Sequence, residues 1–308
     1  MKTVLVTGAS GFLGSQTIQE LIERDYEVHA LTHPGGPTVE EGGKVVVWHA
    51  SDLLDVDDRR SLIDEIKPTH LLHVAWYDEY GKYWASTENI RWMDASSDLV
   101  EKFAEAGGRR VVVAGTSAEY DWSSGRCNEL TTPIKPDTVY GHSKNTLHER
   151  LVTLSAEKGL SLGWGRMFFY YGPREQKERF VPSVVIPLVR GQGALCTHGR
   201  QVRDYLYVSD AGRAFAQLLD SDVEGPVNVA SGEPVELQDI IFKIADILGK
   251  RELVDLGARP AREGEPLLLV ADVGRLKDEV GWSPRVSLDE GLRLAIEWWS
   301  KNLDVVAS

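Results

Sequence analysis

Cysteine is scarce in this sequence, and long apolar runs are missing. Only Cys127 and Cys196 occur among the 308 residues, and they form neither a metal-binding spacing nor a disulfide framework. We therefore expect two packing residues, no metal site and a reducing, cytoplasmic environment. No apolar run approaches the roughly 18 residues that a membrane-spanning helix needs, so no membrane association is expected.

Basic residues are also fewer than acidic residues. Asp and Glu number 47 against 34 Lys and Arg, which gives a formal net charge of −13. General nucleic-acid binding is therefore disfavoured, although a local basic site for one phosphorylated small molecule is compatible with this composition. The first six residues run directly into a strand pattern and lack the architecture of a signal peptide, which again favours the cytoplasm.

Strand and helix patterns alternate along the first half of the chain, which predicts a doubly wound parallel sheet of the α/β class. Apolar runs predict strands at residues 2–6, 27–32, 44–49, 70–74, 110–114 and 161–168. Helical periodicity predicts helices after the first glycine-rich turn and at residues 55–66, 88–106 and 138–158.

The regular alternation of strand and helix patterns ends after Gly172-Pro173. Further helices are predicted at 181–190, 208–220, 237–248 and 288–299, with a strand at 227–230. No repeat or linker separates these elements from the rest, so we expect a smaller C-terminal domain interleaved with the larger one. The proposed division assigns residues 1–169 and about 203–231 to the larger domain, and residues 170–202 and 232–308 to the smaller.

A glycine-rich turn follows the first strand. The stretch Thr7-Gly8-Ala-Ser-Gly11-Phe12-Leu13-Gly14 stands between a strand and an amphipathic helix, the context of a dinucleotide-binding turn. Gly8 permits the tight turn, Gly11 lets the backbone approach a pyrophosphate, and Gly14 lets the helix pack close to the strand. The alternative is a glycine-rich turn without a ligand.

The expected adenosine end of the site lacks the acid that NAD-preferring sites place about 20 residues beyond the glycines. Thr32-His33-Pro34 stands there instead, so NADP(H) is preferred and NAD(H) is possible, although no arginine is present to hold a 2′-phosphate. His33 either contacts that phosphate or is an ordinary loop histidine. Asp52, with Leu53, either accepts from the adenine amino group or caps the helix at 55–66.

Two more strand ends carry candidate residues. Small Ala75 would let the backbone pass close to the nicotinamide ribose, and the aromatic segment 77–87 follows at the carboxyl edge of the sheet, where ligands bind in such folds. Trp76 either stacks on a sugar or base or packs in the core. Thr116 and Ser117 end the strand at 110–114; their hydroxyls either bond a substrate oxygen or serve as a cap or turn.

Tyr140 and Lys144 lie four residues apart, one helical turn from each other. An ammonium near a phenol favours the phenolate and lowers the tyrosine pKa toward neutrality. Tyr140 is therefore a candidate proton donor or acceptor. The alternative for such a pair is a solvated helix surface.

Together these motifs resemble the extended short-chain dehydrogenase/reductase family, in its nucleotide-sugar epimerase, dehydratase and reductase branch. The resemblance spans nearly the whole chain and rests on an ordered set of pieces. They are Thr7-Gly8-x-x-Gly11-x-x-Gly14, Asp52-Leu53, His73-x-Ala75, Asn89, Thr116-x-x-x-Tyr120, Tyr140-x-x-x-Lys144, Arg166 with Tyr171-Gly172-Pro173, Arg203-Asp204-Tyr205-x-Tyr207-Val208-x-Asp210, Arg262-x-Gly264-Glu265, Val280-Gly281-Trp282-Ser283-Pro284 and Leu288-x-Glu290-Gly291-Leu292.

The resemblance implies a Rossmann-type fold, a nucleotide-diphosphate sugar as substrate and roles for matched residues. Tyr140 would be the acid/base, and Lys144 would hold the nicotinamide ribose and depress the tyrosine pKa. Counting back four residues from Tyr120 makes Thr116 the catalytic hydroxyl, with Ser117 as second choice. The family also suggests a homodimer formed through the helices at 88–106 and 138–158.

Four further residues are expected at the substrate. Asn89 belongs to a matched piece, and Trp76 lies in the loop that has no counterpart in the family. Arg203 and Arg262 correspond to arginines near the diphosphate or the ribose, and guanidinium groups pair with phosphate in bidentate fashion. Surface salt bridging is the alternative for both arginines.

Departures from the family narrow the expected activity. Dehydratases carry an adjacent Asp-Glu pair where Ser117 and Ala118 stand here, Val184 replaces a histidine of the GDP-fucose synthases, and Phe169 replaces an asparagine usual in UDP-galactose 4-epimerases. We expect an NADP(H)-preferring ketoreductase for a nucleotide-linked 4-keto sugar, with a 6-deoxyhexose as the expected sugar. The alternatives are a nucleotide-sugar 4-epimerase that retains NAD and a non-catalytic dinucleotide-binding sensor.

Overall fold

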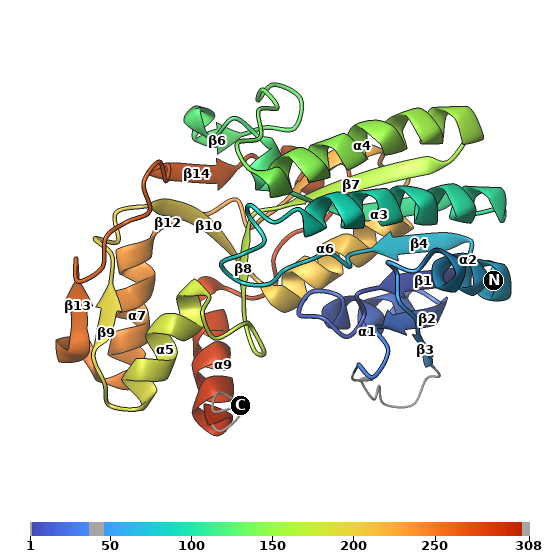
Figure 1. Cartoon of the computed structure of the whole chain (residues 1–308). Helices are drawn as coiled ribbons and strands as arrows, with labels where there is room; N and C mark the ends of the chain where they lie inside the picture. Colours follow the sequence, from blue (N-terminus) through green and yellow to red (C-terminus); the bar gives the residue numbers. More distant parts are fainter. Residues whose placement is uncertain (1, 37–45, 304–308) are drawn as a thin grey trace.

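The computed structural model describes residues 2–36 and 46–303. Seven parallel strands form the central sheet (Figure 1) in the order β11-β7-β5-β4-β1-β2-β3. The expected parallel, doubly wound sheet is therefore confirmed. The bounds are β1 Lys2–Thr7, β2 Tyr26–Thr32, β3 Val46–Ala50, β4 His70–His73, β5 Arg110–Thr116, β7 Ser161–Met167 and β11 Gly225–Val229. Lys44, the predicted start of the third strand, lies outside the described residues.

Helices cover both faces of this sheet (Figure 1). On one face lie α2 (Val56–Ile66), α3 (Glu88–Glu105) and α4 (Val139–Lys158), and on the other lie α1 (Ser15–Glu23) and α6 (Val208–Asp220). Alternate strand residues point to opposite faces, so Leu5 packs in the first layer and Val4 in the second. Burial on both faces explains why the inner strands β1, β4, β5 and β7 are mostly apolar, whereas the edge strand β3 has no buried residue.

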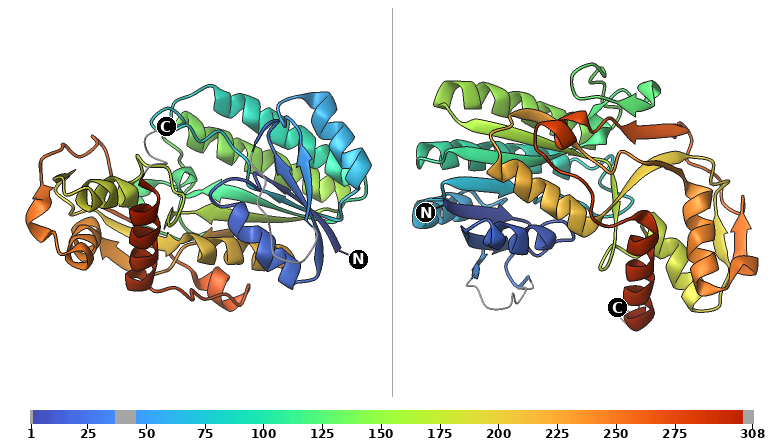
Figure 2. Two further views of the ribbon diagram at one scale, coloured as in Figure 1. Left: turned by 90° about the horizontal axis from the view of Figure 1, so that it is seen from below. Right: turned by 180° about the vertical axis from the view of Figure 1, so that it is seen from behind.

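The remaining elements form a smaller part beside the large sheet, as the views in Figure 2 show. Its core is a separate apolar cluster from α5 (Phe180–Val189), α7 (Leu237–Leu248) and α9 (Leu288–Lys301). Its strands are β12 (Pro234–Glu236), β10 (Val202–Tyr207), β14 (Leu268–Ala271) and β6 (Arg126–Cys127), with β8 (Phe169–Tyr171) paired to β10, and the separate pair β9 (Ala194–Cys196) and β13 (Val254–Leu256). A short helix, α8 (Gly274–Asp278), packs near β11.

The chain crosses between the two parts several times. The sequence-based division assigns β10 to the larger domain, but β10 pairs with strands of the smaller sheet. The next elements, α6 and β11, belong to the large sheet and its helices. β6 arises from the β5–α4 connection and pairs with β14, about 140 residues further along. A periodicity argument misses strands of two or three residues such as β6 and β8. The precise domain division remains a proposal.

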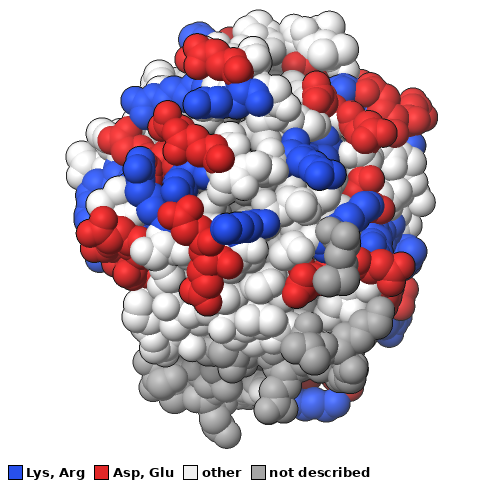
Figure 3. Space-filling view, turned by 90° about the vertical axis from the view of Figure 1, so that its right-hand side faces the viewer, with Lys and Arg blue, Asp and Glu red and all other residues white. Residues whose placement is uncertain are grey.

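Charges of both signs are interspersed on the face shown in Figure 3. Among the described residues, acids and bases pair across neighbouring helices, as in Lys102–Asp64 and the pairing of Arg59 and Arg60 with Asp98. No helix in the described part of the chain is long and apolar enough to cross a membrane. Within the same residues, no cluster of three or more His, Cys, Asp or Glu side chains is arranged to hold a metal ion.

Candidate active site

A cavity of about 650 Å³ opens at the carboxyl ends of the central strands, where the two parts of the molecule meet. The glycine-rich turn and the ends of β2, β4 and β5 contribute one side of its lining, and residues 262–266 with Arg203 contribute the other. The sheet order reverses around β1, and such switch points are the usual ligand sites of doubly wound folds. All sequence-predicted site residues except Asn89 line this cavity.

The glycine-rich turn has the close packing that the sequence predicts. Gly8 has φ +69°, and a Cβ there would lie 2.9 Å from backbone atoms of Ala75. A Cβ on Gly14 would overlap the carbonyl oxygen of Gly8, because α1 starts directly against the end of β1. In the described structure no side chain caps α1, and its first turn carries no acid. An uncapped helix N-terminus facing a cavity fits the pyrophosphate of a dinucleotide.

Polar side chains mark the expected adenosine end. The hydroxyls of Ser10 and Thr32 are 3.0 Å apart and line the cavity beside His33, whose Nδ1 lies 3.1 Å from the Pro34 carbonyl oxygen. Ser10 and Thr32 were not singled out from the sequence, although their positions in the turn and at the end of β2 pointed to this edge. Asp52 and Leu53 also line the cavity.

The helix-cap alternative for Asp52 is wrong. Asp55 caps α2 by accepting hydrogen bonds from the N–H groups of Asp57 and Asp58. Asp52 instead accepts from the Leu54 N–H at 2.9 Å, and its own N–H donates to Asp58. Since Asp55 performs the capping, the Asp52 carboxylate can face the cavity.

Thr116, Tyr140 and Lys144 come together at the inner end of the cavity. Thr116 ends β5 and caps the 3₁₀ turn η1 (Ser117–Glu119), where its hydroxyl accepts from the Ala118 N–H at 3.2 Å. Thr116 also lowers the pKa of the Tyr140 phenol, so the two side chains lie close together. The cap role and the contact with the candidate acid/base are thus compatible. Ser117 also lines the cavity, and its carbonyl oxygen accepts from the Trp122 indole.

The predicted effect of Lys144 on Tyr140 is wrong in this structure. Burial raises the pKa of Tyr140, and the nearby Thr116 side chain opposes that rise only in part. The Lys144 ammonium instead donates to the Ala114 carbonyl oxygen at 2.8 Å and lies 3.6 Å from the centre of the Trp76 ring. Tyr140 is therefore protonated at neutral pH.

The pKa of Lys144 itself is strongly lowered. Its side chain belongs to a helix face that packs on the sheet, and the residue is 3% exposed. Burial lowers its pKa from 10.5 to about 7, and the negative charge of Glu119 counteracts this shift. The indole of Trp76 provides a cation–π contact that favours the charged form. The ammonium therefore titrates in the physiological range.

Asn89 is not at the substrate surface, so the prediction of a substrate contact is wrong. It is completely buried, its Nδ2 donates to the carbonyl oxygens of Tyr83 and Ser86, and its Oδ1 accepts from the Trp76 indole at 2.8 Å. Asn89 thereby fixes the aromatic loop and the orientation of Trp76. Trp76 lines the cavity as expected, but it covers Lys144.

Arg203 and Arg262 both line the cavity, in different states. Arg203 is buried and forms an ion pair with Glu265 at 2.7 Å, and it also donates to backbone carbonyl oxygens. The salt-bridge alternative therefore applies to Arg203, with a buried guanidinium and a partly exposed carboxylate. Arg262 is exposed, and its guanidinium lies 5.2 Å from the Trp84 ring centre.

Several lining residues were not predicted. The rings of Tyr83 and Trp84 contact the Tyr140 ring edge-on, at centroid distances of 5.2 and 5.8 Å. Tyr170 stacks on Phe12 of the glycine-rich turn, and Arg179 lies 5.4 Å from the Tyr83 ring centre. The sequence showed an aromatic loop and a charged loop after Pro173, but no local pattern indicates which members of these loops reach the cavity.

Comparison with known proteins identifies the family of this chain. The model of the family described as "NAD dependent epimerase/dehydratase family" matches residues 4–230, and the chain belongs to that family. A dTDP-glucose 4,6-dehydratase of Xanthomonas campestris is 25% identical, over 98% of this chain and 94% of the relative.

Two solved structures share the fold and 27% sequence identity. The UDP-glucose 4-epimerase of Thermus thermophilus, in complex with NAD, superposes with a TM-score of 0.83 over 97% of this chain and 99% of the epimerase. MoeE5, in complex with UDP-glucose and NAD, gives a TM-score of 0.83 over 98% of this chain and 99% of MoeE5. The family resemblance stated from the motifs is thus confirmed.

Proposed function

We propose that this protein reduces a nucleotide-linked 4-keto sugar, with a 6-deoxyhexose as the expected sugar, by means of a nicotinamide cofactor. The observation that carries the proposal is the meeting of Thr116, Tyr140 and Lys144 in the cavity that also contains the glycine-rich turn. The cofactor, when bound, supplies hydride to the keto carbon. The residues of this chain must then position the carbonyl and deliver one proton to its oxygen.

Tyr140 is proposed as the proton donor. Burial holds its pKa above the ordinary value, so the phenol keeps the proton that reduction requires. The hydroxyl of Thr116, already in contact with the phenol, orients the same substrate oxygen, and Ser117 is the second candidate for this role. Lys144 would hold the nicotinamide ribose, for which its ammonium must leave part of its contact with the Ala114 carbonyl oxygen.

The glycines, with Phe12, Leu13, Asp52, Leu53 and Ala75, are proposed to hold the dinucleotide. The 2′-position of the adenosine ribose would face Thr32 and His33, which carry no negative charge, and this supports the preference for NADP(H). The family description and the complexes of the two similar proteins favour NAD(H) instead. Parallel titrations with NADH and NADPH decide between the two cofactors.

The absence of suitable carboxylates argues against 4,6-dehydration. Ser117 and Ala118 stand where dehydratases carry their acids, and the nearby Glu119 is fully buried and bonded to Arg166. A 4-epimerase is the second candidate, supported by the similarity to the Thermus epimerase. An epimerase uses the same proton-transfer residue but returns the hydride to the other face of the sugar.

The test is incubation of pure protein with NADH or NADPH and a panel of nucleotide 4-keto-6-deoxy sugars, followed by product stereochemistry. A reductase consumes cofactor stoichiometrically, whereas an epimerase interconverts sugars without added cofactor. Tyr140→Phe should lower turnover by about 10²–10⁴-fold and leave cofactor binding intact, while the control Tyr80→Phe, at an exposed tyrosine, keeps full activity. Cofactor binding without turnover on any sugar would favour the sensor.

A further inference from the structure

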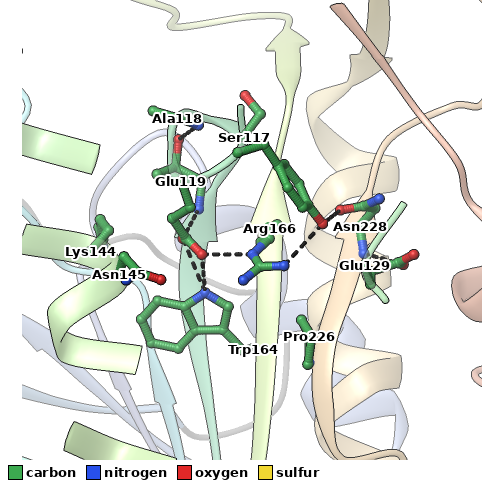
Figure 4. A network of polar contacts seen from close by, with 12 residues as sticks. Ser117, Ala118, Glu119, Glu129, Lys144, Asn145, Trp164, Arg166, Pro226 and Asn228 are labelled. Carbon is green, nitrogen blue, oxygen red and sulfur yellow. Dashed lines mark hydrogen bonds and ion pairs between the residues drawn. The ribbon is translucent and has the colours of Figure 1, made fainter. Parts of the chain in front are cut away.

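Glu119 is a buried acid that bonds the backbone of Thr116, and Figure 4 shows its carboxylate facing Trp164 and Arg166. It is completely inaccessible, and its carboxylate accepts hydrogen bonds from three groups. These donors are the Thr116 N–H at 2.8 Å, the Trp164 indole N–H at 3.1 Å and the Arg166 Nε at 2.6 Å. One side chain therefore joins the end of β5 to two residues of β7.

Arg166 extends these contacts to β11. Its Nη1 donates to the Tyr120 hydroxyl at 3.0 Å, and that hydroxyl donates to Asn228 Oδ1 at 2.7 Å (Figure 4). Arg166 is 2% exposed, so both charges of the Glu119–Arg166 pair are removed from water. Such a pair is tolerated because each charge is bonded on several sides, and it is poorly suited to proton exchange with a substrate.

The packing around Glu119 leaves the η1 turn little freedom. A Cβ on Gly115 would overlap the Trp164 indole nitrogen and lie 2.8 Å from Glu119 Oε1. A Cβ on Gly141, next to Tyr140, would overlap the Ala118 carbonyl oxygen. The turn is therefore held between the Glu119 network and the first turn of α4, which carries the candidate acid/base.

The charge of Glu119 also reaches α4. It raises the pKa of Lys144 against the effect of burial, and Figure 4 places Lys144 on the side of the network where the carboxylate lies. The other titratable groups nearby are His73 of β4 and His148 of α4, whose pKa values burial lowers to about 3 and about 4, so both are neutral. Tyr140 is protonated, and the charge of Arg166 is paired with Glu119 itself.

We propose that Glu119 is a positioning residue: its bonds to the Thr116 N–H and to Arg166 hold the end of β5 beside the first turn of α4, and its buried carboxylate is the negative charge that acts on Lys144, which is bonded to the same strand end at Ala114. Its significance for turnover rests on the proposed function, whereas its effect on Lys144 concerns cofactor binding alone. Two readouts therefore separate the two parts: the dissociation constant of NADH or NADPH, whichever binds, between about pH 6 and 10, and kcat on a substrate identified by the panel.

The charge is tested with Glu119→Gln, which keeps an acceptor for the Thr116 N–H. In the wild-type protein the cofactor should bind more weakly as pH rises through about 7, where Lys144 loses its proton. In Glu119→Gln this weakening should begin at lower pH, leaving binding about fivefold weaker than wild type at about pH 7. The matched control is Glu129→Gln, because Glu129 is a buried glutamate of the same region that accepts from the Asn228 N–H. The pH dependence of cofactor binding in this variant should equal that of wild type.

The positioning is tested with Glu119→Asp, which keeps the charge but shortens the side chain. Its cofactor profile should match wild type, while kcat falls about 10- to 100-fold because the carboxylate no longer reaches Thr116 and Arg166 together. If Glu119→Gln fails to fold, Glu119→Gln/Arg166→Met removes both charges and carries the binding test. Three results would each overturn the proposal. They are a pH dependence of cofactor binding that is the same in the folded charge variant as in wild type, an unchanged kcat in Glu119→Asp, and failure of both charge variants to fold.

Discussion

Replacing Lys144 with methionine should stabilise the fold at neutral and acidic pH. The pKa of this lysine falls from 10.5 in the unfolded chain to about 7 in the folded one, chiefly because the ammonium is buried. A lowered lysine pKa means that the folded protein bears the cost of a buried charge below about pH 7. At about 1.36 kcal/mol per pKa unit, that cost is on the order of 5 kcal/mol.

The pH dependence has a definite sign. Between about pH 7 and 10.5 the unfolded chain binds more protons than the folded one, so wild-type stability gains about 1.4 kcal/mol per pH unit from Lys144. Lys144→Met has no such group. Its advantage over wild type should therefore be largest below about pH 7 and should shrink steadily toward about pH 10.

Methionine also has a cost that does not depend on pH. It cannot donate to the Ala114 carbonyl oxygen, and an unsatisfied buried acceptor costs about 1–3 kcal/mol. The net gain at pH 6 should therefore be about 2–4 kcal/mol, with a change of sign between about pH 8 and 10. Urea unfolding at five pH values measures this difference, and the control is Lys158→Met at the exposed end of α4. A stability difference between Lys144→Met and wild type that is constant from pH 6 to 10 would refute the reasoning.

Three other changes test the cavity and the assembly. Gly14→Ala should weaken cofactor binding at least tenfold and cost about 1–3 kcal/mol of stability, because its Cβ overlaps the backbone of Gly8. The control is Gly193→Ala, whose Cβ has 3.8 Å of room, and it should change neither the cofactor titration nor the melting temperature. Glu265→Gln should free the Arg203 guanidinium and tighten calorimetric binding of a nucleoside diphosphate about fivefold, and an equal effect of Glu263→Gln, a neighbouring acid, would mean that only net charge matters. If the protein dimerises through α3 and α4, Val152→Glu, at a half-exposed position of α4, should yield monomers in light scattering. Leu294→Glu, on α9, is the control and should leave the dimer intact. A monomeric wild-type protein would refute the dimer prediction.

Much of the cofactor side of the site is local in the sequence. The contact between Gly14 and Gly8 spans six residues, and Tyr140 and Lys144 share one helical face, so glycine spacing and helical period are sufficient to predict them. The alternation of buried strands and amphipathic helices likewise predicts the parallel sheet, because each element shows its own period. The position of Thr116 follows from the end of its strand.

Ionisation and pairing depend on residues far apart in the chain. Tyr140 keeps its proton because surrounding residues bury it, and Lys144 is held by Ala114 and covered by Trp76, 68 positions earlier. Arg203 meets Glu265, and Asn89 turns inward to bond Trp76, for reasons that no local pattern contains. The sequence by itself determined the class of fold, the dinucleotide turn and the Tyr–Lys pair, since these follow from steric and periodic rules among near neighbours. Only the tertiary structure decided which of these groups carry charge and which face the cavity, because burial and charge pairing are properties of the assembled core.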